Sequence, residues 1–392
     1  MSNSDVVLLS AKRTAIGGLT GTLAGFSAAQ LGTIAIKAAV EQSGVAPEKI
    51  DETIMGQVLT AGVGMNPARQ AARHAGLPDH APAMTINQVC GSGLRAIMLG
   101  AQQIQTGMAN YVVAGGQESM TNAPHVAAVR QGKKAGNLEL VDTMMHDALT
   151  DVFHNYPMGN TAENVAQKYN LTRQEQDEFA LRSHQNAAAA QSAGFFDKEI
   201  VPIEIKTRKS TFEFGADEGV RADSNIETMA KLRPIFDADG TVTAANSSSI
   251  NDGAAAVVLA RGESATAEGL SPIATIKAFA HTGLDPAYMG LGPISASRLA
   301  AKRAGWSLDE IDLFEFNEAF AAQSLAVVKD LDVDPKKVNI HGGAIALGHP
   351  VGMSGTRVLG TLAYALEKRG GGRGIASLCI GGGMGVAMAI EV

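Results

Sequence analysis

The chain of 392 residues has few cysteines, few aromatic residues and no long stretch of one kind of charge. Its two cysteines, Cys90 and Cys379, lie far apart and outside any CxxC pair, so neither a zinc site nor a disulfide scaffold is expected. The net charge of −7 comes without a block of like charges, which argues against nucleic acid as a partner. Because no apolar run is long enough to span a bilayer, no membrane partner is expected either.

The sequence does have enough apolar residues for a large folded core. Hydrophobic residues make up 45% of the chain, which at this length is sufficient for two or three well-buried subdomains. The N-terminus, MSNSDVVLLSAKRTAIGG, has no basic leader before a long apolar core and passes almost directly into the strand-like DVVLLSA. With so few cysteines, these features predict a cytoplasmic protein in a reducing compartment.

Two parts of the sequence repeat each other. SGVAPEKIDETIMG and AGWSLDEIDLFEFN share a glycine, a helix start and Ile-Asp before an apolar strand, and residues 92–95 (SGLR) match residues 354–357 (SGTR) at almost the same offset. Two separate matches in one register predict a duplicated α/β unit. The matches pair Gly44 and Asp51 of the first copy with Gly305 and Asp312 of the second.

The surplus chain between the two copies predicts an inserted lid or loop domain. It falls between about residues 118 and 249, which is more chain than one copy of the unit needs. It includes TAENVAQKYNLTRQEQDEFALRSHQNAAAAQSAG, which we interpret as one helical run, and the polar segment EIKTRKSTFEFGADEG.

Cys90 lies in TINQVCGSGLRAIM, between a predicted strand and a glycine-rich turn. Apolar residues recur at helical spacing from Leu94 to Ile104 and stop at Gly107, which predicts a helix that begins just after the cysteine. The positive end of a helix lowers a cysteine pKa from about 8.5 into a range of roughly 3.5–7.5, so we expect a thiolate at neutral pH. As an isolated feature, this cysteine is also explained as a small buried hydrophobic residue.

Three further polar residues lie where predicted strands or turns end. If a pseudo-twofold axis relates the two copies, His349 in ALGHPVGMSG approaches Cys90 and can take its thiol proton. Cys379 ends a strand in SLCIGGGMG and borders the same region. Asn317 in FEFNEAFAA lies where a strand passes into a helix, with Glu318 in the first turn. Structural alternatives exist for each: helix caps for His349 and Asn317, and a packing residue for Cys379.

Together, four motifs resemble those of the thiolases: NQVCGSGLRA, FNEAFAAQ, NIHGGAIALGHPVGMSG and SLCIGGGMG. The resemblance extends along essentially the whole chain, including MGNTAENVA and LRPIFDADGTVTAANSSSINDG. It implies an α/β fold with duplicated βαβαβαββ halves, a five-layer α-β-α-β-α core and an inserted loop domain. The implied boundaries are 1–119 for the N-terminal half, completed by 250–270, then 120–249 for the inserted domain and 271–392 for the C-terminal half.

Within the thiolases, the chain is most similar to the short-chain biosynthetic type, because of CIGGGMG and APHVAAVRQGKKAGNLELVDTMM. This resemblance implies acetyl-CoA C-acetyltransferase activity, the reversible Claisen condensation of two acetyl-CoA molecules to acetoacetyl-CoA and CoA through an S-acyl-cysteine. Cys90 would be the nucleophile, activated by His349, and Cys379 the second acid and base. Asn317, through an ordered water, and His349 would form one oxyanion site, and the backbone N–H groups of Cys90 and Gly381 the other.

The resemblance further implies acyl-CoA substrates, no metal or other cofactor, and a CoA path across the inserted domain. Arg221 would be the cation for the nucleotide end, although a solvated surface charge is an equally simple explanation for it. Pro157 stands where short-chain thiolases often carry a histidine, which keeps a longer or branched 3-ketoacyl-CoA open as substrate. The residues expected to line the path are Leu149, Met158, Arg221, Ser248, Ala319 and Phe320.

Other functions are weighed against this one. The GMSG turn is similar to that of thiolases acting on 3-oxoadipyl-CoA, so a degradative 3-ketoacyl-CoA or 3-oxoadipyl-CoA thiolase is the main alternative. A ketoacyl synthase would carry two motif histidines. This chain has one motif histidine and a cysteine at those places, which argues against a ketoacyl synthase. A non-catalytic acyl-binding protein would not need Cys90, His349 and Cys379 together. A dinucleotide-binding oxidoreductase is suggested only by GVGMNPARQAAR, and this match is weak because the segment lacks the third glycine of a dinucleotide site.

Two further hypotheses concern assembly and oxidation. The segment of residues 124–142 resembles a tetramerisation loop, which implies a homotetramer arranged as a dimer of dimers. Two thiols in one site also raise the hypothesis that oxidation joins Cys90 to Cys379, which requires their Cβ atoms to lie about 3.5–4.5 Å apart.

Overall fold

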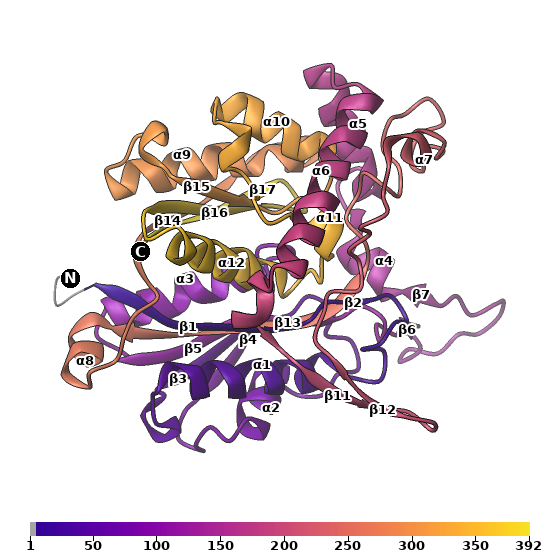
Figure 1. The fold of residues 1–392 in the computed structure, drawn as a ribbon. Coiled ribbons are helices and arrows are strands. Elements are labelled where there is room, and N and C mark those ends of the chain that lie inside the picture. Colours follow the sequence, from indigo (N-terminus) through magenta and orange to yellow (C-terminus); the bar gives the residue numbers. More distant parts are fainter. Residues whose placement is uncertain (1–4) are drawn as a thin grey trace.

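Most strands of the chain belong to one mixed sheet of eleven strands in the computed structural model, which describes residues 5–392 (Figure 1). Two short strands lie beside its main path: β10 (Ile200–Val201) pairs with β1, and β2 (Gly17–Gly18) pairs with β13. The order along the path is β15 (Leu313–Phe316), β16 (Arg373–Ile380), β17 (Met384–Glu391), β14 (Ala274–Gly283), β1 (Val6–Thr14), β13 (Asn251–Arg261), β5 (Tyr111–Ser119), β3 (Glu52–Gly56) and β4 (Ala83–Ile86).

The path consists of two copies of one strand arrangement. In β3-β5-β13-β1 the first pair is parallel and the next two pairs are antiparallel, and β15-β16-β17-β14 repeats this pattern. The parallel pairing of β3 with β4 also has a counterpart in the C-terminal copy, a single parallel bridge between Phe314 of β15 and Val338. The predicted duplication is therefore confirmed. The sequence did not predict that the copies join into one sheet, through antiparallel pairing of Val6–Leu8 in β1 with β14.

Helices complete the five predicted layers, which Figure 1 shows from the side. The outer face of the N-terminal copy is covered by α1 (Ala28–Ser43) and α2 (Pro67–His74), and that of the C-terminal copy by α9 (Gly292–Ala304) and α10 (Ala321–Leu331). Between the copies lie α3 (Ser92–Gln105) and α12 (Ser354–Lys368). Because α12 packs against sheet strands of both copies and against α3, it is buried on every side over its first thirteen residues.

The repeated residues perform the same tasks in both copies. Gly44 and Gly305 end α1 and α9 in the left-handed conformation, with φ of 73° and 75°, which glycine adopts without strain. The Asp51 Oδ2 accepts a hydrogen bond from the Tyr111 N–H at 3.0 Å, and the Asp312 Oδ2 accepts one from the Arg373 N–H at 2.8 Å. Each aspartate thus fastens the start of one strand to its neighbour.

The N-termini of α3 and α12 approach each other at a pair of glycines. A Cβ on Gly355 would lie 2.3 Å from the Leu94 backbone nitrogen, and a Cβ on Gly93 would lie 2.9 Å from the Thr356 nitrogen. Only residues without a side chain allow this contact. The turns that precede the two helices, one with Cys90 and the other with His349, are thereby brought to the same place.

The segment between the copies forms helices and small hairpins. The predicted single helical run is wrong, because α5 (Met158–Tyr169) ends at Asn170, which has a φ of 52°, and Thr172 starts a new helix with its own capping box, α6 (Arg173–Ser192). The domain boundaries stay a prediction. Across the described residues, the remaining α-helices and strands are α4 (Thr143–Ala148), α7 (Ile226–Ala230), α8 (Gly262–Ala267), α11 (Ala344–Leu347), β6 (His125–Val126), β7 (Val141–Asp142), β8 (Thr150–Asp151), β9 (Tyr156–Pro157), β11 (Ile203–Lys206) and β12 (Thr211–Phe214).

Candidate active site

Cys90 lies in a tight turn immediately before α3, where the sequence predicted it. Val89, a β-branched residue, has a φ of 46°, a strained conformation that such residues rarely adopt. The turn is fixed by Ser92, whose Oγ accepts a hydrogen bond from the Gln88 N–H at 2.8 Å and donates one to the Val89 carbonyl at 2.7 Å. The strain is thus held in place by the first residue of the following helix.

The prediction of a lowered pKa for Cys90 is wrong. Burial raises the pKa of its thiol to about 11, and the carboxylate of Glu118 contributes in the same direction. The N–H groups of Gly381 and of Cys90 itself lie against the sulfur and lower the pKa, but by less than burial raises it. Cys90 packs against an apolar cluster that includes Val58 and Leu59, although the residue keeps some exposure. Cys90 is therefore a thiol at rest and needs a base.

His349 is the base that the motifs predict. Its side chain is buried, with Nδ1 at 2.6 Å from the Ser354 Oγ and Nε2 at 3.4 Å from the Asn317 Nδ2. Burial lowers the pKa of the imidazole to about 4, helped by the cation of Arg357, so His349 is neutral at pH 7. The alternative of a helix cap is wrong for this residue, because α12 begins at Ser354 with Met353 as its N-cap.

Cys379 lies fully buried near the end of β16, as predicted. Burial raises the pKa of its thiol, and the next contribution in that direction comes from Cys90, which shows that the two sulfurs share one environment. Both cysteines are free thiols.

Asn317 directly follows β15, and its N–H donates to the Ser377 carbonyl at 3.0 Å. The alternative of a helix cap is wrong here too, because Phe320 is the N-cap of α10. Glu318 therefore precedes the helix instead of lying in its first turn. Its carboxylate accepts hydrogen bonds from the Ser183 Oγ at 2.6 Å and from the Asn339 Nδ2 at 2.8 Å.

Sequence reasoning missed Glu118, which lies buried near the end of β5. Its carboxylate accepts hydrogen bonds from the N–H groups of Val58 at 2.9 Å, Leu59 at 3.2 Å and Gly352 at 3.0 Å. Burial raises the pKa of Glu118 to about 7. The residue ties the loop after β3 to the turn that carries His349. The sequence signal that could have indicated this residue is a carboxylate near the end of a predicted strand that begins with apolar residues.

Five of the six residues expected along the CoA path lie close to the predicted catalytic residues. The Met158 N–H donates to the Leu149 carbonyl at 2.9 Å, and the Met158 sulfur lies 3.4 Å from where a Cβ of Gly381 would be. The Ser248 N–H donates to the Ala319 carbonyl at 3.0 Å. One apolar cluster contains Met158, Ala319, Phe320 and Cys379.

Arg221 is the sixth of these residues. Its side chain is exposed, and its backbone N–H donates to the His184 Nδ1 at 3.3 Å. Its role at the nucleotide end of CoA stays a prediction. Within residues 5–392, no group of three or more histidine, cysteine or carboxylate side chains is placed to bind a metal ion.

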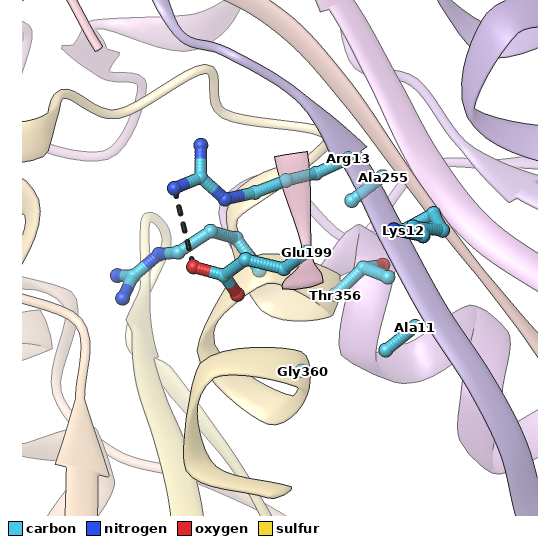
Figure 2. Close-up of a pocket in the computed structure, with 8 residues that line it drawn as sticks. Ala11, Lys12, Arg13, Glu199, Ala255, Thr356 and Gly360 are labelled. Atoms are coloured by element: carbon cyan, nitrogen blue, oxygen red, sulfur yellow. Dashed lines mark hydrogen bonds and ion pairs between the residues drawn. The ribbon is translucent and has the colours of Figure 1, made fainter. Parts of the chain in front are cut away.

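A small cavity of about 10 Å³ behind α12 is a structural feature and not the substrate site (Figure 2). It is lined by Arg13, Glu199 and Arg357, among others, and Arg13 forms an ion pair with Glu199 at 3.2 Å. Arg357 forms a buried ion pair with Glu315 at 2.7 Å. A cavity of this volume holds about one water molecule at most, so these charges serve to fix α12 against its neighbours.

Comparison with known proteins gives the family of the chain. A family model described as "Thiolase, N-terminal domain" matches residues 6–263, and "Thiolase, C-terminal domain" matches residues 270–392. The chain belongs to the thiolase family. The resemblance predicted from its four motifs is confirmed, and as a thiolase the chain is an acyltransferase.

Similar thiolases include curated proteins and solved structures. An acetyl-CoA acetyltransferase of Rhizobium meliloti is 55% identical over the full length of both chains, and one of Cupriavidus necator is 56% identical over 99% of each. The crystal structure of the Bacillus anthracis acetyl-CoA acetyltransferase matches with a TM-score of 0.96 at 45% identity, over 99% of this chain and 98% of that one. Human mitochondrial 3-ketoacyl-CoA thiolase matches over all of both chains with a TM-score of 0.97 at 43% identity. The fold is therefore common to thiolases that are named for different substrates.

Proposed function

We propose that this thiolase is an acetyl-CoA acetyltransferase, which condenses two acetyl-CoA molecules to acetoacetyl-CoA and CoA and also catalyses the reverse thiolysis. The observation that carries the proposal is the grouping of two free thiols, a neutral imidazole and an amide at the ends of separate elements. The names of the relatives at 55% and 56% identity support acetyl-CoA as the substrate.

The first half-reaction transfers an acetyl group to Cys90. As the Cys90 sulfur attacks the thioester carbonyl, its proton moves to the His349 Nε2, which the low pKa of this imidazole leaves unprotonated. The carbonyl oxygen becomes an oxyanion that the N–H groups of Cys90 and Gly381 stabilise, since both already lie against the sulfur. CoA leaves as a thiolate and takes the proton of Cys379, which becomes a thiolate.

The second half-reaction forms the carbon–carbon bond. The Cys379 thiolate removes a proton from the methyl carbon of a second acetyl-CoA, and Asn317 and His349 stabilise the enolate oxygen. The enolate carbon attacks the acetyl group on Cys90, the carbon–sulfur bond breaks, and the Cys90 sulfur regains its proton from His349. Both thiols and the imidazole then have their starting protonation, and the same steps in reverse describe thiolysis.

Thiolytic cleavage by the purified protein tests this proposal. Acetoacetyl-CoA, longer 3-ketoacyl-CoAs and 3-oxoadipyl-CoA are each mixed with free CoA, and kcat/KM is compared. The proposal predicts the highest value for acetoacetyl-CoA. A clear preference for longer or carboxylated substrates would assign a degradative thiolase instead. Pro157 would then be the first position to change, because it is the N-cap residue of α5 and adjoins Met158.

We also propose a cytoplasmic homotetramer without a bound cofactor. The hairpin β6–β7 projects away from the rest of the chain in Figure 1. It exposes apolar side chains that a partner subunit would cover, among them Val129 at 55%, Leu138 at 54% and Leu140 at 60% exposure. In residues 5–392, no helix is both long and apolar enough to cross a membrane.

A further inference from the structure

The two helices that start at the active site begin with the same residue. Ser92 is the first residue of α3, and Ser354 is the first residue of α12. Each serine donates its hydroxyl hydrogen to a carbonyl of the preceding turn, Ser92 to Val89 at 2.7 Å and Ser354 to Pro350 at 2.9 Å. The duplication has thus placed an equivalent hydroxyl next to each of two catalytic turns.

The remaining partner of each hydroxyl differs between the copies. The Ser92 Oγ accepts from the Gln88 backbone N–H at 2.8 Å, so it fixes the main chain of the Cys90 turn. The Ser354 Oγ contacts a side chain instead, the His349 Nδ1, at 2.6 Å. Both members of this contact are nearly inaccessible to solvent, at 1% exposure for Ser354 and 6% for His349. Water therefore does not compete for it.

Hydrogen-bond accounting assigns the proton in this contact. A serine hydroxyl has one hydrogen, and its oxygen lies 2.9 Å from the Pro350 carbonyl, which can only accept, so we assign the hydrogen to that bond. The Ser354 Oγ is then an acceptor toward His349, so the hydrogen between them lies on Nδ1. The other ring nitrogen, Nε2, keeps its lone pair and faces the Asn317 amide at 3.4 Å.

The main chain of His349 is held independently of Ser354. Its N–H donates to the Asn251 Oδ1 at 2.8 Å, and the Asn251 Nδ2 donates to the Gly17 carbonyl at 3.0 Å. The contact of the Ser354 Oγ with Nδ1 acts on the ring, whereas its hydrogen bond to the Pro350 carbonyl acts on the neighbouring main chain.

We propose that Ser354 is a positioning residue, whose hydroxyl fixes the His349 imidazole in the Nδ1–H tautomer and presents the Nε2 lone pair to the thiol of Cys90. This inference rests on the proposed thiolase reaction, in which Nε2 receives the Cys90 proton. A ring with the opposite tautomer has a hydrogen on Nε2 and cannot accept that proton.

Three variants test the inference: Ser354→Ala, Ser354→Thr and, as the matched change in the other copy, Ser92→Ala. Loss of the Ser354 hydroxyl should lower kcat for acetoacetyl-CoA thiolysis on the order of 10²-fold with little change in KM, because the base is misplaced and substrate contacts are not. Threonine retains a hydroxyl and should restore most of kcat. Ser92→Ala should slow the alkylation of Cys90 and leave the tautomer of His349 unchanged.

The tautomer itself is read from ¹⁵N shifts of histidine-labelled protein, with the His349 signals assigned through a His349→Asn sample. The proposal predicts a protonated Nδ1 and an unprotonated Nε2 in the parent protein, and a mixture of tautomers in Ser354→Ala. It is overturned if the parent protein carries the hydrogen on Nε2, or if a folded Ser354→Ala variant keeps the parent kcat. Failure of the proposed function is a separate result, because the parent protein would then cleave none of the 3-ketoacyl-CoAs, while the ¹⁵N spectrum would still report the tautomer.

Discussion

Cys90 and His349 are both uncharged at rest. A cysteine at a helix N-terminus was expected to be a thiolate, yet burial raises its pKa to about 11 and lowers that of His349 to about 4. The sequence predicted that the turns of the two residues meet, because both turns contain motifs at repeated positions. It could not predict their protonation, because desolvation depends on side chains such as Val58, which come from another part of the chain.

Alkylation of Cys90 by iodoacetamide should therefore have an unusual pH dependence. Only the thiolate reacts, so the rate should keep rising above pH 9, toward the raised pKa of about 11. The measurement is the pseudo-first-order rate between pH 6 and 11, with Cys379→Ser protein used to isolate Cys90. A rate that levels off below pH 7 would instead indicate the lowered pKa that the helix N-terminus alone suggested.

The low pKa of His349 also predicts an effect on stability. An unfolded histidine has a pKa of about 6.5, so between pH 6.5 and 4 the unfolded state binds more protons and stability falls as the pH is lowered. The titration of His349 alone should lower the free energy of unfolding by about 3 kcal/mol near pH 4. Urea unfolding of the parent protein and of His349→Asn should show a smaller acid-side loss in the variant. Equal slopes for both proteins below pH 6.5 would contradict the assignment.

At the scale of elements, the close contact of α3 with α12 is the feature that assembles the site. We expect Gly355→Ala to destabilise the fold by about 3 kcal/mol, because the new methyl group would overlap the Leu94 backbone. Gly360→Ala, farther along the same helix, is the matched control, since its methyl group would lie 3.1 Å from the Ala11 Cβ and neighbours need move little. Thermal and urea unfolding measure both. If both variants are equally stable, α3 and α12 can move apart without loss of stability, which would contradict the prediction.

Elements were predicted best where the signal was local. The start of α3 after Cys90, its end shortly before Gly107 and the strand that contains Cys379 followed from periodicity and glycine. The break between α5 and α6 was missed because it needs Asn170 in a left-handed conformation, and apolar periodicity does not report this. The N-terminus of α10 was placed too early because the chain continues past Asn317 before it turns into the helix.

At the scale of the whole molecule, the repeat in the sequence predicted two copies and a central site between them. It did not predict the pairing of β1 with β14, since register between distant strands leaves no local pattern. Contacts such as Glu118 with Gly352, or Arg357 with Glu315, were missed for the same reason, because each partner lies in a segment that looks unremarkable by itself.

The hairpin β6–β7 gives a prediction about assembly. Replacing residues 127–140 with a short Gly-Ser turn should convert tetramers to dimers, since it removes the exposed apolar side chains of Val129, Leu138 and Leu140. Sedimentation velocity of the parent and shortened proteins measures this. A parent protein that sediments as a monomer, or a shortened protein that stays tetrameric, would contradict the assignment of this hairpin to the tetramer contact.

The central claim is that the two thiols divide the chemistry, with Cys90 carrying the acyl group and Cys379 moving protons. The most direct test is mass spectrometry of peptides from Cys379→Ser and Cys90→Ser proteins after incubation with acetyl-CoA. The account predicts one acetyl group, on the Cys90 peptide of Cys379→Ser protein, and no acetylated cysteine in Cys90→Ser protein. Acetylation of Cys379, or a Cys90 that stays unmodified while the parent protein turns over, would contradict it.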